Sequence, residues 1–63
     1  MKLEHNTKVD ALYVRFGRGV VESSQEVSPG IILDYDAQDR IVAIEILNAR
    51  QHLAPDAFPI AAE

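Results

Sequence analysis

The chain has 63 residues, a net charge of −4 at pH 7 and no cysteine, which indicates one small acidic domain without disulfides or thiolate metal sites. Its six lysines and arginines are spread singly, which argues against direct binding to nucleic acid. No apolar run approaches the roughly 20 residues of a membrane span, and the first residues lack the apolar stretch of a signal peptide, so a cytoplasmic protein is expected.

The first two predicted strands are "KLEH", which ends at Asn6, and "DALYVRF". Alternation in the second strand places one set of side chains on a common face, namely Leu12, Val14 and Phe16. Gly17 and Gly19 then bracket Arg18, a pattern typical of a tight hairpin turn.

A third strand is predicted in "VVESSQEV", whose polar middle favours an edge or a solvent-facing position. The segment Ser28-Pro29-Gly30 ends it, because proline fixes φ and has no N–H to donate.

The stretch "GIILDYDAQDRIVAIEIL" predicts a hairpin with a type I turn at residues 36–39. Asp36 can accept backbone N–H bonds, and Asp39 lies where a left-handed residue is needed. Pairing of Asp36 with Arg40 then sets Asp34 opposite Val42. One predicted face carries Ile32, Asp34, Val42, Ile44 and Ile46. The other carries Ile31, Leu33, Tyr35, Ile41, Ala43, Glu45 and Leu47. Both faces are mostly apolar and require cover.

The segment "NARQHL" predicts one short helix, with Asn48 as N-cap and an end before Pro55. We therefore predict an α+β, mainly β fold: a four- or five-stranded antiparallel meander with one short C-terminal helix over residues 1–54. Residues 55–63 form a tail that includes Phe58 and Ile60.

One short helix cannot cover two sheet faces, and a chain of this size has a marginal core, so we expect a homodimer or higher oligomer built on the sheet. The face chosen as the interface also carries a glutamate that a partner's arginine can pair with at the rim. Its predicted residues are Leu33, Ile41, Ala43, Glu45 and Leu47.

An acidic cluster is the alternative site. Asp34 and Asp36 point the same way on a strand, and Asp10 joins them if its strand is a neighbour. Such a cluster can bind Mg²⁺ or Ca²⁺, or divide into an acid and a base. The favoured interpretation is that Asp34 and Asp36 bond turn backbone and pair with Arg40. Glu45 lies on the opposite predicted face from Asp34, which weakens the cluster further.

Other candidates for chemistry are weaker. His5 and His52 are far apart in sequence and lie at element ends, where a histidine–carboxylate metal site is less common than a surface histidine. Ser23-Ser24 has no adjacent base. We therefore expect no catalytic residue, no bound metal and no cofactor.

Three blocks, "DALYV", "PGIILDYD" and "IVAIEILNA", resemble a bacterial and archaeal family of short proteins catalogued as domain of unknown function 2283. The matching positions are Asp10, Ala11, Leu12 and Tyr13, then Pro29, Gly30, Asp34, Tyr35 and Asp36, then Ile44, Glu45, Ile46, Leu47 and Ala49. The chain departs from the pattern at His5-Asn6, where the family often has Tyr-Asp, and at Asp39 and Ala43, where it has glycine. The resemblance implies a small β-meander with a short C-terminal helix and no settled activity.

Two function classes follow. The first is a non-enzymatic interaction module, in one form an antitoxin-like protein that binds a small basic protein. The second is a small hydrolase or metal-binding protein that uses Asp34 and Asp36. The first is favoured, because no nucleophile–base pair and no complete ligand set is visible.

Overall fold

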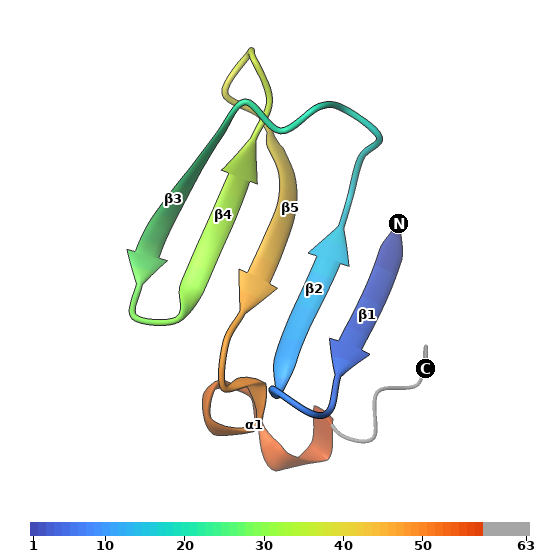
Figure 1. Ribbon diagram of the computed structural model, residues 1–63, viewed down its shortest axis with the longest axis vertical. Helices are drawn as coiled ribbons and strands as arrows, with labels where there is room; N and C mark the ends of the chain where they lie inside the picture. The colour runs from blue at the N-terminus through green and yellow to red at the C-terminus, as the bar shows by residue number, and fades with distance from the viewer. Residues whose placement is uncertain (58–63) are drawn as a thin grey trace.

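The computed structural model describes residues 1–57, which form one antiparallel sheet of five strands with a short helix at one end (Figure 1). The strands are β1 Lys2–Asn6, β2 Ala11–Arg15, β3 Ser23–Ser28, β4 Ile31–Tyr35 and β5 Ile41–Ile46. Helix α1 spans Ala49–His52, and a 3-10 turn, η1, spans Pro55–Ala57. The mainly β class with one short helix is therefore confirmed. Phe58 and Ile60 of the predicted tail lie outside the described residues.

No helix among residues 1–57 is long and apolar enough to cross a membrane. Below, the end of the sheet where α1 lies is called the helix end, and the end with the β4–β5 turn is called the turn end (Figure 1).

The strand order is β1-β2-β5-β4-β3, which is not the order of a simple meander. The tight hairpin turn predicted at Gly17 and Gly19 is wrong, because β2 pairs with β5. The backbone N–H groups of Phe16 and Gly17 both donate to the carbonyl of Val42, so the pairing with β5 continues past the end of β2. The chain then crosses the turn end to reach β3 at the far edge, where every residue is exposed as predicted for an edge strand (Figure 1).

The β4–β5 turn has the predicted chemistry. The N–H of Asp36 donates to the carbonyl of Arg40 over 2.9 Å, and Asp39 has a φ of 61°. One carboxylate oxygen of Asp36 accepts the N–H groups of Gln38 and Arg40. Local sequence therefore fixes this turn.

The register beyond the turn differs from the prediction by one residue. Tyr35 pairs with Ile41 but Asp34 pairs with Ala43, which leaves Val42 as an extra residue in β5. Such a bulge moves every later side chain of the strand to the opposite face. Leu33 consequently lies opposite Ile44. The prediction that Leu33 shares one face with Ala43 and Glu45 is wrong, because these two residues pair with Asp34 and Ile32 on the other face.

The sheet is consequently amphipathic, whereas the sequence predicted two apolar faces. Residues directly opposite each other on paired strands share a face, so each face can be followed from strand to strand. The apolar face is crossed by a row that we call the apolar row, composed of Leu3, Val14, Ile44, Leu33 and Gln25. The other, polar face is crossed by Glu4, Tyr13, Glu45, Ile32 and Glu26.

Helix α1 covers the apolar face at the helix end only. Ala49 is fully buried there against Leu12 and Ile46, and Leu53 packs against the same cluster. Asn48 holds the predicted N-cap position, but its side chain makes no capping bond and its φ is 51°.

The connection from β2 to β3 covers the polar face at the turn end. The Arg15 guanidinium donates to the carbonyls of Gly17 and Gly19, and these hydrogen bonds keep the connection against the sheet. Arg15 pairs with Ala43 and therefore lies on the polar face. Val42 and Ala43 are 4% and 0% exposed, whereas the turn end of the apolar face has no comparable cover among residues 1–57.

Candidate functional site

The three carboxylates of the alternative acidic site occupy different parts of the molecule. Asp34 lies on the polar face of β4, where it accepts a hydrogen bond of 2.6 Å from Ser24 Oγ. Asp36 lies in the turn beyond β4, and Asp10 lies between β1 and β2 at the helix end (Figure 1). Among residues 1–57, no group of three or more histidine and carboxylate side chains could hold a metal ion.

Asp10 joins the β1–β2 turn to helix α1. Its carbonyl accepts the N–H of Ala49, and its carboxylate accepts the N–H of Arg50 over 3.0 Å. The hydrogen bond from the Arg50 backbone, aided by His5 and the Arg50 charge, holds the pKa of Asp10 below its usual value, although burial opposes the shift. Asp10 thus caps a helix that begins 39 residues later in the chain.

The carboxylate of Asp36, like that of Asp10, binds backbone N–H groups and stabilises a local structure. Besides the two backbone N–H groups, it accepts a bond of 3.0 Å from the Nε of Arg40. The N–H of Arg40 is the main cause of the lowered pKa of Asp36, with smaller contributions from Gln38 and the Arg40 side chain. The favoured sequence interpretation, turn bonding with an Arg40 pair, is confirmed for Asp36; Asp34 instead bonds Ser24.

The two histidines also join elements. The buried ring of His5, 1% exposed, places Nε2 3.1 Å from an Asp10 carboxylate oxygen. His52 places Nδ1 2.9 Å from the carbonyl of Leu47 and Nε2 3.1 Å from that of Pro29, so its ring bridges α1 and the β3–β4 turn.

Glu45 lies on the same face as Asp34, which corrects the sequence prediction that they face opposite ways. It pairs with Tyr13 on one side and Ile32 on the other. Of the arginines near the sheet, Arg15 donates to the segment that follows β2, and Arg50 lies beside Asp10.

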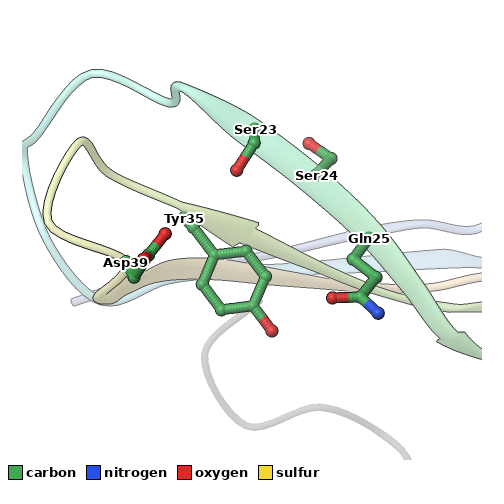
Figure 2. Close-up of a pocket in the computed structure, with 5 residues that line it drawn as sticks. All are labelled: Ser23, Ser24, Gln25, Tyr35 and Asp39. Carbon is green, nitrogen blue, oxygen red and sulfur yellow. The ribbon is translucent and has the colours of Figure 1, made fainter.

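An open depression of about 500 Å³ lies at the turn end, lined by Ser23, Ser24, Gln25, Tyr35 and Asp39. Figure 2 shows that Tyr35 and Gln25 extend to the same side of the β3–β4 pair, whereas Ser24 points to the other. These side chains can donate and accept hydrogen bonds. The lining residues include no histidine, and the hydroxyl of Ser24 donates to the carboxylate of Asp34.

The main candidate site is the turn end of the apolar face, which we call the open apolar face. Its centre is three half-buried members of the apolar row, Val14, Ile44 and Leu33. Tyr35 continues the face along β4. Phe16, 50% exposed, comes directly after the end of β2, and its N–H still donates to β5. The sequence pattern did not identify this surface, because the bulge at Val42 decides which residues share it.

Residues 2–50 match the family described as "Protein of unknown function (DUF2283)". The chain belongs to this family. The resemblance found in the sequence is therefore confirmed over most of the chain. There is no significant match among curated proteins or among solved structures.

Several motif residues of this DUF2283 protein shape the backbone. Asp10 caps α1, and Asp36 organises the β4–β5 turn. Gly30 has a φ of 82°, and a Cβ on it would lie 3.0 Å from Cε1 of His52. At these positions the blocks that identify the family hold the fold together.

Proposed function

We propose that this protein is a small non-enzymatic interaction module whose open apolar face binds another protein surface. The observation that carries the proposal is the row of half-buried aliphatic side chains, Val14, Ile44 and Leu33, together with the exposed turn end beside it. Val14 and Ile44 pack on one side against the cluster that contains Ala49 of α1, whereas Phe16 and Ile41 toward the turn end are each 50% exposed. The largest apolar patch on a typical monomer measures roughly 300–600 Å² and is often a functional surface. Each large aliphatic side chain fully removed from water contributes roughly 1.5–3 kcal/mol, which favours association.

The bonding of the carboxylates supports a binding role over a hydrolytic one. The carboxylate of Asp36 accepts hydrogen bonds from the backbone and side chain of Arg40 in the turn, and the carboxylate of Asp34 accepts one from Ser24. Neither carboxylate is paired with a second acid in a shared site, which is the arrangement that separates an acid from a base.

The charge distribution supports a basic protein as one class of partner. Residues 19–39 contain five carboxylates and no lysine or arginine. These residues form β3, β4 and the ends of the adjoining segments, so one edge of the sheet is acidic. An antitoxin-like role, in which this edge contacts a basic toxin, is the specific form of this proposal.

Photo-crosslinking in the cells that naturally produce the protein tests the proposal. A benzophenone amino acid replaces Phe16, which is aromatic and 50% exposed beside the open apolar face. The matched control carries it at Lys2, an exposed residue of the polar face in β1, at the edge of the sheet away from β3. We expect a discrete crosslinked product from position 16 and little from position 2. No product from position 16, or equal products from both, would contradict a specific interface on this face.

A further inference from the structure

We propose that the occupant of the open apolar face is a second copy of this chain, packed face to face about a two-fold axis parallel to the strands. This inference rests on the proposed function and specifies the partner. Two-fold pairing lets one patch bury its own copy, which is the commonest symmetry of soluble oligomers.

The edges of the sheet are poor places for a second copy to add. The β1 edge carries an ion pair in which Nζ of Lys2 lies 3.5 Å from Oε2 of Glu4. The β3 edge carries Glu26 and a register irregularity before Ser28. Charges and bulges on edge strands hinder pairing with another strand, so association through a face is favoured.

The charges of the chain favour its own apolar face as the complementary surface. The strand residues on that face are uncharged apart from His5, which is buried at the helix end. The carboxylates of Glu4, Glu45 and Glu26 lie on the opposite face. The strands of two copies with a charge of −4 each can therefore meet without bringing like charges together, and Asp39, which lines the depression beside Tyr35 and Gln25, lies at the turn-end rim of the contact. A strongly basic protein would instead be drawn to the polar face.

The order of the apolar row specifies the contacts. Ile44 on the central strand is the middle of the five residues in the row. An axis through this position sets Ile44 against the partner's Ile44 and Val14 against the partner's Leu33. It also aligns the helix ends of both copies, and α1 lies beyond the ends of β2 and β5 rather than across the row (Figure 1). Among residues 1–57, α1 thus leaves the row accessible to a second sheet.

The area available sets the expected affinity. An aromatic side chain buries roughly 150–250 Å², so Phe16 at 50% exposure offers on the order of 100 Å². With the half-buried aliphatic residues and Tyr35, one copy buries on the order of 300–400 Å², against about 800 Å² per partner in a standard interface. A dimer with a dissociation constant in the micromolar range or weaker is therefore expected.

Crosslinking through introduced cysteines tests the geometry, since the chain has no cysteine of its own. Packed sheets lie about 10 Å apart, whereas a disulfide needs Cα atoms within about 7 Å, so a short bis-maleimide is the suitable reagent. We expect Ile44→Cys to give covalent dimer and Glu45→Cys, the next residue on the opposite face, to give little. A mixture of Val14→Cys and Leu33→Cys proteins should crosslink more than either alone. Equal crosslinking of the two β5 variants would overturn the geometry.

Sedimentation analysis from about 1 μM to 1 mM tests the dimer itself. Leu33→Asp removes two leucines per dimer and should raise the dissociation constant more than ~100-fold. The control Ile32→Lys places a charge at the next residue, which lies on the polar face between Glu26 and Glu45, and it should leave the dimer intact. Circular dichroism checks folding; if Leu33→Asp unfolds, Phe16→Ser, at an exposed position, takes its place.

A wild-type protein that stays monomeric throughout this range overturns the inference. If position 16 still crosslinks to a different protein in cells, the proposed function stands and only the identity of the partner is wrong. If neither self-association nor any crosslink occurs, both proposals fail.

Discussion

Replacing Gly30 with alanine is expected to destabilise the fold through two separable effects. The first is conformational: Gly30 has a φ of 82°, and a left-handed backbone costs an L-residue roughly 1–2 kcal/mol. The second is steric, because the new Cβ would lie 3.0 Å from Cε1 of His52. The ring must then move away from the carbonyls of Leu47 and Pro29, which it contacts at 2.9 and 3.1 Å.

The combined effect is large for so small a domain. A neutral imidazole donates one hydrogen bond, and its loss costs roughly 0.5–1.5 kcal/mol, so the total cost of Gly30→Ala is roughly 1.5–3.5 kcal/mol. Domains have about 0.05–0.15 kcal/mol of stability per residue, which gives roughly 3–9 kcal/mol for this chain. The variant should therefore unfold at a much lower urea concentration than the wild type.

A double-mutant cycle measured by urea unfolding and circular dichroism separates the two effects. In a His52→Ala background the ring is absent, and Gly30→Ala should cost only the conformational part, roughly 1–2 kcal/mol. Gly17→Ala is the matched control, because no atom lies within 4 Å of its would-be Cβ and its φ is not positive. Equal costs of Gly30→Ala in both backgrounds would refute the contact with His52, and no cost in either would refute the backbone argument.

Three further changes have defined outcomes. Asp10→Asn should lower the stability of the fold at neutral pH. Because folding lowers the pKa of Asp10, the ionised carboxylate stabilises the fold above the ordinary pKa of 3.8, and this stabilisation is lost as the pH falls below it. The stabilities of wild type and variant, measured by acid denaturation, should therefore converge at low pH. A difference that persists at the lowest pH would contradict this. Asp39→Gly relieves the left-handed φ of 61° and should raise stability by about 0.5 kcal/mol, or the melting temperature by roughly 2–4 °C; no rise would mean that aspartate is unstrained there. Ala43→Leu overpacks a site that is 0% exposed and should cost roughly 1–3 kcal/mol in urea unfolding, whereas an unchanged midpoint would reveal unfilled space.

The sequence by itself determined the features that depend on neighbouring residues. The five strand segments, the break at Pro29-Gly30 and the type I turn at residues 36–39 follow from alternation, proline and glycine chemistry, and the carboxylate of Asp36. The position of the short helix after Asn48 also follows from local residues, although the side chain that caps it is Asp10, which no local pattern could identify.

The tertiary structure alone decided the strand order and the faces of the sheet. β2 pairs with β5 because its backbone groups find partners there, and this choice depends on residues far apart in the chain. The single extra residue at Val42 reverses which side chains of β5 accompany those of β4. Side chains alternate with a period of two, so a shift of one residue turns two mixed faces into one apolar and one polar face. The open apolar face, and with it the proposed interface, exists because of that bulge.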